Sequence, residues 1–199
     1  MIDSVIFDFG QVLVHFEPKY MVERYITDPE DSALLQEVVF DRLYWDKLDA
    51  GTITDKETVE EIKKRIPERL HKAAEDIYYN WIYNIPEIEG MREVLLLANQ
   101  KFQGRVYLLS NISVYFAEHF SEIPILELVN GCVFSATAGF TKPNSDIFRH
   151  ICEKFDLIPQ NTLFVDDSEK NIKGAEDFGI KGYLFDRDAK KLKKYLEKL

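Results

Sequence analysis

The sequence predicts an α/β protein, built as a doubly wound parallel sheet with a helical-bundle cap inserted into it. Two observations lead to this class. From residue 90 onward, short apolar runs alternate with helical patterns, which is typical of parallel strands covered by helices on both faces. Before that, residues from about 17 to 86 contain charged, aromatic-rich helical patterns and no convincing strand. We therefore expect a helical unit inserted after the first strand.

The first strand ends on a carboxylate. The run Val5-Ile6-Phe7, bounded by Gly10, is typical of a buried strand in a parallel sheet. A charge at its carboxyl end, Asp8, is costly to bury without a partner or a role. In open α/β sheets, ligands bind at that edge. Asp8 is therefore the first candidate for a functional residue.

The inserted segment carries clear signals for two of its helices. Thr54-Asp55-Lys56-Glu57 is a capping box, which opens a helix that runs to about Ile66. Pro67 ends that helix, and a second helix is expected from Glu68 to Asn84. The turn at Ala50-Gly51 precedes the pair. These signals predict a small helical bundle.

The second part of the chain supplies the rest of the sheet. Its predicted strands are residues 106–110, 132–135, 162–165 and 181–185. Its predicted helices are residues 90–98, 114–119, 146–155, 169–178 and 189–199. The strand before Asp8 must join this sheet, because the helical segment offers it no neighbours. We therefore predict a Rossmann-like core from residues 1–15 and 87–199, and a helical cap from residues 16–86.

Composition narrows the range of functions. Hydrophobic residues make up 46% of the 199 residues, which is enough for a packed core. The formal net charge of -10 argues against nucleic acid or an anionic membrane as a partner. No apolar run reaches membrane-spanning length, and the two cysteines, Cys132 and Cys152, predict buried thiols of a reducing compartment. We expect a cytoplasmic protein with a small-molecule partner, and the sequence indicates no oligomeric state.

Polar residues also follow three of the later strands. In chain order they are Ser110 and Asn111, then Lys142, then Asp166 and Asp167. Because the carboxyl ends of parallel strands open on one edge, we expect these side chains to gather around Asp8. The alternative is that each is an ordinary turn or capping residue. That alternative requires several unrelated turns to imitate one site, so we favour a shared site.

This group of side chains fits phosphoryl transfer. Three carboxylates call for a divalent cation, and Mg²⁺ is typically held by one or two carboxylates with waters and a substrate phosphate. An aspartate can attack phosphorus and form an aspartyl-phosphate. The Ser110 hydroxyl and the Lys142 ammonium would bind the phosphate oxygens and hold the reacting oxygens in line.

Four segments resemble, in order, the four motifs of the haloacid dehalogenase-like hydrolase superfamily. They are Phe7-Asp8-Phe9-Gly10-Gln11-Val12-Leu13, Leu109-Ser110-Asn111, Thr141-Lys142-Pro143 and Val165-Asp166-Asp167-Ser168. The resemblance covers the whole chain, with a helical cap between the first and second motifs. Cap placement and the paired aspartates of the fourth motif are similar to the subgroup that includes sugar phosphatases and the phosphatase domain of soluble epoxide hydrolase.

The resemblance implies a role for each site residue. Asp8 is implied as the nucleophile and a Mg²⁺ ligand, and Ser110 and Lys142 as the groups that hold the phosphate. Asp167 is implied as a direct Mg²⁺ ligand, and Asp166 as a ligand or as the group that orients a metal-bound water. Asn111 is implied as a contact of the substrate or phosphate, and Asn171 as a brace for the loop.

Gly10 departs from the family pattern. Most phosphatases of this family have a second aspartate two residues after the nucleophile, which protonates the leaving group and then activates water. The metal ligand from that position is a backbone carbonyl, so Gly10 retains the ligand and loses the proton shuttle. General acid–base catalysis contributes roughly 10²–10⁴ in rate. Either the substrate has a good leaving group, or another residue moves the proton. His15 is one candidate, against the favoured interpretation of a histidine that lines the hinge.

The sequence therefore predicts a Mg²⁺-dependent phosphatase that acts on a small phosphorylated metabolite, sugar phosphates included, through an aspartyl-phosphate on Asp8. On the cap, Trp45 is a candidate substrate contact, although aromatic stripes in a bundle more often form its core. Asp46 and Asp49 either bind sugar hydroxyls or face solvent. The alternatives are a phosphate-binding or regulatory module and, less favoured, a 2-haloacid dehalogenase.

Overall fold

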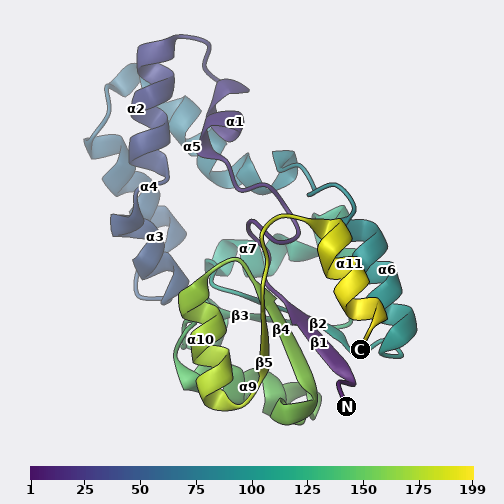
Figure 1. Ribbon diagram of the computed structural model, residues 1–199. Coiled ribbons are helices and arrows are strands. Elements are labelled where there is room, and N and C mark those ends of the chain that lie inside the picture. Colours follow the sequence, from purple (N-terminus) through teal and green to yellow (C-terminus); the bar gives the residue numbers. More distant parts are fainter.

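The computed structural model describes residues 1–199, apart from the side chain of Asn84. Its centre is a five-stranded parallel sheet (Figure 1). The strands, in spatial order, are β3 (Cys132–Phe134), β2 (Val106–Ser110), β1 (Ser4–Phe7), β4 (Thr162–Asp166) and β5 (Lys181–Leu184). After β1, the chain adds β2 and β3 on one side of it, and then β4 and β5 on the other side. The strand order therefore reverses between β1 and β4, where open α/β sheets bind ligands.

The register explains which residues meet at that reversal. Phe7 pairs with Leu108 on one neighbour and with Val165 on the other. Asp8 and Asp166 each stand one residue beyond this level, so the two carboxylates lie side by side at the carboxyl edge. The sequence prediction of a shared edge depended on parallel strands, and all four strand pairs are parallel.

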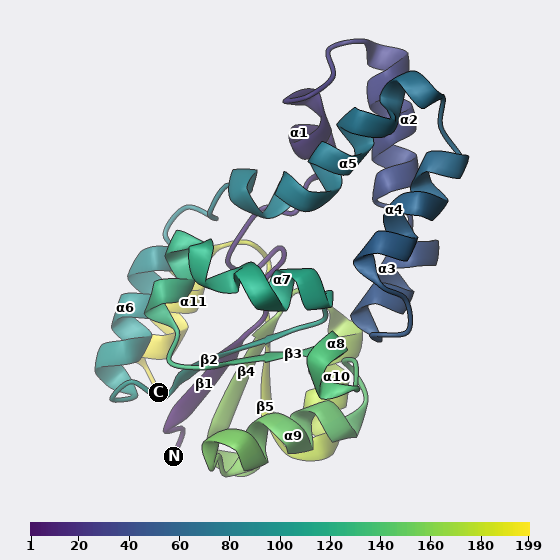
Figure 2. The same ribbon diagram turned by 180° about the vertical axis from the view of Figure 1, so that it is seen from behind.

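Helices cover both faces of the sheet, which confirms the predicted doubly wound class (Figures 1 and 2). Because successive side chains point to opposite faces, Phe7 joins the apolar cluster of α6 and α11, and Ile6 joins that of α9 and α10. The helices of this part are α6 (Met91–Lys101), α7 (Val114–His119), α8 (Ser135–Ala138), α9 (Ser145–Phe155), α10 (Glu169–Phe178) and α11 (Ala189–Glu197). Short 3-10 turns are η3 (Phe120–Glu122), η4 (Pro124–Leu128) and η5 (Pro159–Asn161).

Residues between β1 and α6 form the helical bundle, which stands beside the carboxyl edge of the sheet (Figure 2). Its helices are α1 (Pro18–Glu23), α2 (Pro29–Val39), α3 (Arg42–Asp49), α4 (Asp55–Lys64) and α5 (His71–Asn80), with 3-10 turns η1 (Glu68–Leu70) and η2 (Trp81–Asn84). The capping box at Thr54 is present. The helix predicted over Glu68–Asn84 is divided into η1, α5 and η2. The bundle has its own apolar cluster, and the domain bounds stay a prediction.

The bundle contacts the core at several places, of which two fix its position. The Asp55 carboxylate accepts hydrogen bonds from the Tyr78 hydroxyl within the bundle (2.8 Å) and from the Tyr115 backbone N–H at the start of α7 (3.3 Å). The turn after α3 lies against α8 (Figure 2). Gly51 in that turn has φ +67°, and a Cβ there would lie 2.8 Å from the Ala136 carbonyl oxygen. Only glycine fits this approach.

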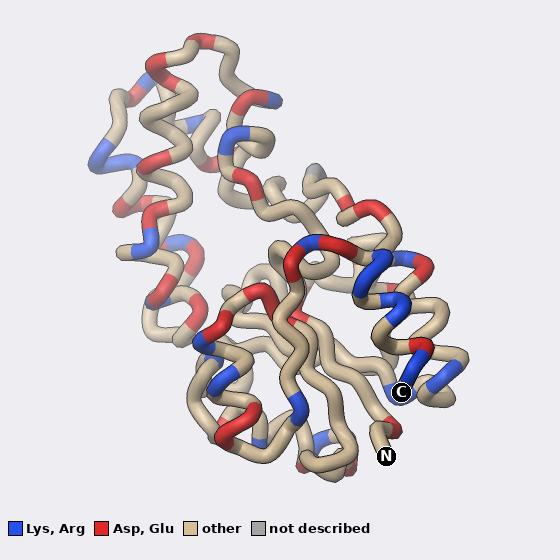
Figure 3. Tube along the Cα trace, viewed as in Figure 1, with Lys and Arg blue, Asp and Glu red and all other residues tan. Residues whose placement is uncertain are grey.

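Charged residues are distributed unevenly along the chain (Figure 3). Lysines gather on α11, where Lys190, Lys191 and Lys194 are exposed while Leu192 and Leu196 are buried. These lysines therefore form the solvated face of an amphipathic helix. Within the part of the chain that the structure describes, no helix has the length and apolar character needed to cross a membrane.

Candidate active site

A cavity of about 380 Å³ lies between the carboxyl edge of the sheet and the bundle. Its floor comes from the core and its roof from the cap. The floor includes Asp8, Gly10, Ser110, Asn111, Lys142 and Asn171. The cap side includes Phe16, Phe40, Arg42, Trp45 and Asp49. The strand ends thus meet the bundle at one hollow, as expected for an inserted cap.

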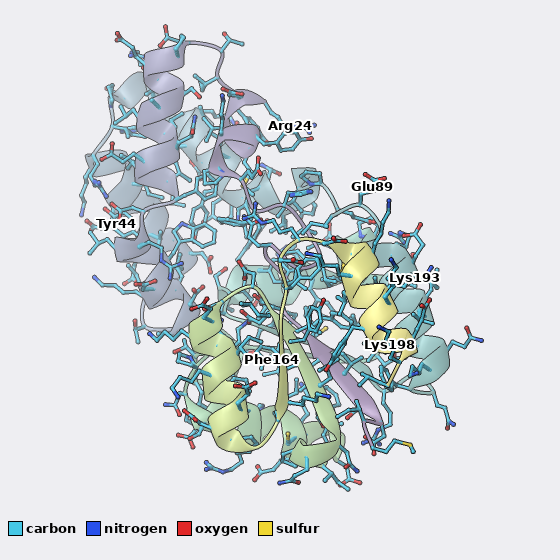
Figure 4. All side chains as sticks on the ribbon, viewed as in Figure 1. Arg24, Tyr44, Glu89, Phe164, Lys193 and Lys198 are labelled. Atoms are coloured by element: carbon cyan, nitrogen blue, oxygen red, sulfur yellow. The ribbon has the colours of Figure 1, made fainter. Side chains whose placement is uncertain are left out.

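Lys142 is the centre of the floor. Its ammonium Nζ lies 2.6 Å from Asp8 Oδ1 and 2.8 Å from Asp166 Oδ2, and it donates a third hydrogen bond to the Leu109 carbonyl at 3.1 Å. The ring of Phe164, seen on β4 in Figure 4, lies 5.5 Å from Nζ. Burial opposes the charge of Lys142, but the adjacent Asp166 and Asp8 carboxylates raise its pKa above the usual value. The lysine is therefore a fixed, buried cation.

Asn111 holds this lysine in place. Its Oδ1 accepts a hydrogen bond from the Lys142 backbone N–H (2.8 Å), and its Nδ2 donates to the Lys142 carbonyl (3.1 Å). On the other side of the loop, α10 approaches so closely that a Cβ at Gly174 would lie 2.6 Å from the Pro143 carbonyl oxygen. Asn111 also lines the cavity. The structure thus adds a positioning role to the predicted substrate contact.

Asp166 is held equally firmly. It is fully buried, and its Oδ1 accepts a hydrogen bond from the Ser168 backbone N–H at 2.8 Å. The Asn171 amide nitrogen lies 3.1 Å from both of its carboxylate oxygens. Ser168 is at the same time the N-cap of α10, since its hydroxyl accepts from the Asn171 N–H. The start of one helix therefore orients the carboxylate on β4.

Asp8, Asp166 and Asp167 form a possible cation site. One carboxylate oxygen from each lies within 4.8 Å of the others. Burial raises the pKa of Asp8; Lys142 opposes the rise and Asp166 adds to it. Burial, and then the Asp166 charge, also raise the pKa of Asp167, although this residue is partly exposed. One ammonium cannot balance three carboxylates, and hard oxygen donors at this spacing suit Mg²⁺.

The other predicted residues divide into two groups. Ser110, Gly10 and Trp45 line the cavity with Asp8. The Trp45 indole N–H donates to the Val39 carbonyl (2.8 Å), so its ring contributes an apolar face to the cavity. His15 does not line this cavity. It lies in a second hollow with Glu89 and Arg187, among others.

Two cap residues gain importance from the tertiary structure. For Asp49 the sequence allowed either a contact with sugar hydroxyls or exposure to solvent. In the structure, Asp49 is buried in the wall of the cavity. The sequence analysis missed Arg42, which lies seven residues before Asp49 on α3, about two helical turns, and lines the same cavity. The Gly51 turn was the one local signal for the position of α3, because it marks a close approach to the core.

The family model for haloacid dehalogenase-like hydrolases matches residues 2–179. The chain therefore belongs to this family of hydrolases, which confirms the resemblance of its four motifs.

Two curated proteins are similar over most of their length. The D-ribitol-5-phosphate phosphatase of Bacteroides thetaiotaomicron is 25% identical over 198 residues, covering 92% of this chain and 91% of that protein. The sesquiterpene phosphatase astK of Aspergillus oryzae is 25% identical over 181 residues, covering 90% and 87%. The two names share the reaction type and differ widely in substrate.

Solved structures share the fold. The family enzyme bt-2542 of Bacteroides thetaiotaomicron, an Asp-to-Ala mutant in complex with magnesium and inorganic phosphate, has a TM-score of 0.71 at 21% identity, covering 92% of this chain and 94% of that one. The L-2-haloacid dehalogenase of Xanthobacter autotrophicus has a TM-score of 0.69 at 16% identity, covering 96% and 80%. The fold therefore accommodates more than one reaction, and the site must decide between them.

Proposed function

We propose that this protein is a Mg²⁺-dependent phosphatase that hydrolyses a small phosphorylated metabolite through an aspartyl-phosphate on Asp8. The observation that carries the proposal is the contact of one buried ammonium, Lys142, with the carboxylates of both Asp8 and Asp166. A cation beside a nucleophile is suited to an anionic phosphoryl group. The two phosphatase relatives support the same reaction type.

In the first half of the reaction, an Asp8 oxygen attacks phosphorus and the bond from phosphorus to the leaving oxygen breaks. In the second half, water attacks the same phosphorus, the Asp8–phosphorus bond breaks and inorganic phosphate is released. The Ser110 hydroxyl and the Lys142 ammonium hold the phosphate oxygens in both halves. Asn111 and Asn171 keep Lys142 and Asp166 oriented through the hydrogen bonds described above.

The Mg²⁺ site in this proposal consists of Asp8, Asp167 and the Gly10 carbonyl, with Asp166 as a ligand or as a partner of a metal-bound water. The three carboxylate oxygens within 4.8 Å support this assignment. When bound, Mg²⁺ supplies positive charge that favours ionised Asp8 and neutralises the phosphate.

The cavity wall supports a small substrate that is part polar and part apolar. Phe16, Phe40 and Trp45 contribute apolar faces, with Phe16 and Trp45 ring centroids 5.5 Å apart. Arg42 and Asp49 add charged groups beside them. A sugar or polyol phosphate suits this combination, because its hydroxyls need polar partners and its carbon skeleton packs on rings.

One feature favours a second candidate, a phosphate-binding or regulatory module with weak turnover. Gly10 has no side chain to move a proton, so turnover can be lost while phosphate binding remains. The two candidates differ in whether Asp8 is phosphorylated and released repeatedly.

The test is hydrolysis of p-nitrophenyl phosphate by the wild type, by Asp8→Asn and by the matched variant Asp3→Asn, which lies just before β1, outside the cavity. We expect Mg²⁺-dependent turnover that EDTA abolishes, and a loss of at least about 10³-fold in Asp8→Asn because the nucleophile is removed. Asp3→Asn should behave like the wild type. Phosphate binding without turnover in the wild type would instead support the regulatory module. A panel of sugar and polyol phosphates then identifies the substrate class.

A further inference from the structure

The carboxylate of Asp49 is buried, and no contact within the described protein explains why a charged group stands there. It is the last residue of α3, it is only 8% exposed, and it lines the cavity whose floor holds Asp8. Its Oδ1 has no hydrogen-bond partner among the residues that the structure describes. An unpartnered buried carboxylate oxygen costs free energy. Its environment therefore points to a partner that enters the cavity from outside.

The charges around Asp49 keep its proton exchangeable near neutrality. Burial raises the pKa of Asp49 to about 7; Asp46 on the same helix adds to the rise, whereas Arg42 and Lys142 oppose it. The Arg42 guanidinium is itself paired with Asp46 at 2.9 Å. The neighbouring α8, Ser135–Ala138, brings no charged side chain. A carboxyl with such a pKa can both donate and accept a proton at physiological pH.

The geometry of in-line attack at phosphorus requires the proton transfer to occur on the side of the cap. In an in-line displacement, the leaving oxygen lies on the side of phosphorus opposite the nucleophile. Asp8 is on the floor, so the leaving oxygen faces the cap. The water of the second half attacks from that same side. A single acid–base group on the cap can therefore serve both halves.

Gly10 has no side chain for this proton transfer, although the backbone at this position would accept one. A Cβ at Gly10 would lie 3.7 Å from the Phe16 Cβ, an ordinary contact, and its φ is outside the left-handed region. A side chain would thus be tolerated there. The position of Asp49 relative to the core is also fixed. Gly51, two residues after Asp49, lies in a turn that packs directly against Ala136 of the core.

We propose that Asp49 is the proton-transfer group that replaces the side chain missing at Gly10. In the first half, the Asp49 carboxyl gives its proton to the leaving oxygen as the bond from that oxygen to phosphorus breaks. In the second half, the Asp49 carboxylate takes a proton from water as the water oxygen bonds to phosphorus and the Asp8–phosphorus bond breaks. Asp49 is restored and no co-reactant is needed. The inference rests on the proposed phosphatase function.

The test compares Asp49→Asn with Glu60→Gln, a control at an exposed carboxylate on cap helix α4 outside the cavity, on two substrates. D-ribitol 5-phosphate has a poor alkoxide leaving group, and p-nitrophenyl phosphate has a good one. Asp49→Asn should lower kcat/KM for the first about 10²–10³-fold and leave that for the second nearly unchanged. Its kcat should fall for both, with a burst of one p-nitrophenolate per enzyme, because water attack lacks its base. Glu60→Gln should show neither effect.

Two further measurements separate proton transfer from a structural role. For the alkyl phosphate, the wild-type kcat/KM should decline above about pH 7, and Asp49→Asn should lose that limb. The double variant Asp49→Asn/Gly10→Asp should recover about tenfold or more of the lost kcat/KM, because an acid is returned on the floor.

Three results would overturn the inference. One is an Asp49→Asn enzyme with wild-type kcat/KM on the alkyl phosphate, and another is an equal loss of kcat/KM on both substrates. The third is a wild type without Mg²⁺-dependent hydrolysis, which would overturn the proposed function together with the inference. Thermal unfolding confirms that each variant folds, and Asp49→Ala takes the place of Asp49→Asn if the latter does not.

Discussion

The floor and the roof of the cavity use charge in opposite ways. On the floor, Lys142 has three partners, and both Asp166 oxygens accept hydrogen bonds from the core. On the roof, Asp49 has a buried oxygen without a partner among the described residues. A satisfied network stays rigid, whereas an unsatisfied group gains most from a ligand. The floor is therefore a fully paired and rigid network, and the roof holds a carboxylate oxygen that only a ligand in the cavity can satisfy.

The same contrast appears in the packing. Phe164 and the rest of the sheet pack beneath the floor, whereas Tyr44 in the cap belongs to a separate apolar cluster (Figure 4). The two parts are joined by few polar contacts, of which Asp55 to Tyr115 is one. Cap and core also share ring packing, because Trp45 and Trp81 belong to the apolar cluster of the core.

The largest effect is expected from Lys142→Met. Removing this ammonium leaves Asp8 and Asp166 adjacent and uncompensated, which should lower the free energy of unfolding by about 3–5 kcal/mol. The loss should shrink at pH 5 and with added Mg²⁺, because protons or a cation then replace the missing charge. Urea unfolding measures it, with the exposed Lys194→Met as the control. Stability within about 1 kcal/mol of the wild type would contradict a tightly coupled floor.

A smaller effect is expected from Asp55→Ala. The Tyr78 hydroxyl and the Tyr115 N–H lose their shared acceptor, at a cost of about 2 kcal/mol. Because the second bond joins cap to core, the KM for substrate should also rise. Asp28→Ala is the control, since Asp28 caps α2 within the bundle. It should lose stability without a change in KM. Equal KM values in both variants would mean that this contact does not hold the cap.

The stability of Asp49→Asn should depend on pH. The folded-state pKa of Asp49 is raised to about 7, so between about pH 4 and 7 the folded protein binds a proton that the unfolded chain has released. The contribution of the neutral carboxyl to the free energy of unfolding is therefore fully present below about pH 4. It decreases as the pH rises and is lost once the pH has passed the folded-state pKa of about 7. The variant should therefore match the wild type at about pH 4, and its advantage should grow by about 2–3 kcal/mol between pH 5 and pH 8. Thermal unfolding across this range measures the difference, and parallel curves would contradict the raised pKa.

The smallest effect is expected from His15→Asn. His15 lies in the hollow beside Glu89 and Arg187, away from the cavity of Asp8. Turnover should stay within about twofold of the wild type, as is usual for a substitution outside the site. Initial rates on p-nitrophenyl phosphate suffice, and a loss of 100-fold would restore His15 as a proton shuttle.

Much of the fold was readable from local patterns. The predicted helices at residues 114–119 and 169–178 have the predicted bounds, and the Thr54 capping box opens α4 as expected. The helix expected to reach Ile66 ends at Lys64. Helix starts depend on side chains close in sequence, and this is why they were predicted better than that end.

The position of His15 was not readable. It stands only seven residues after Asp8, and nearness in sequence made it a candidate. Two features direct it elsewhere: Gln11 adopts a left-handed backbone with φ 60°, and Val14 pairs with Glu87 across the entry to the cap. The geometry of this turn depends on Glu87, a partner more than seventy residues away in the sequence, so local pattern could not predict where His15 lies.

By itself, the sequence determined the family and the floor of the site, because parallel strands must bring their carboxyl ends to one edge and each motif residue stands at such an end. It also determined that the usual proton shuttle is missing at Gly10. Only the tertiary structure decided that Asp49 lines the same cavity as Gly10, since the burial of Asp49 depends on how α3 meets α8 across the Gly51 turn. The physical reason is that the register of a sheet follows from local pattern, whereas the approach of two separate units follows from contacts that no local pattern encodes.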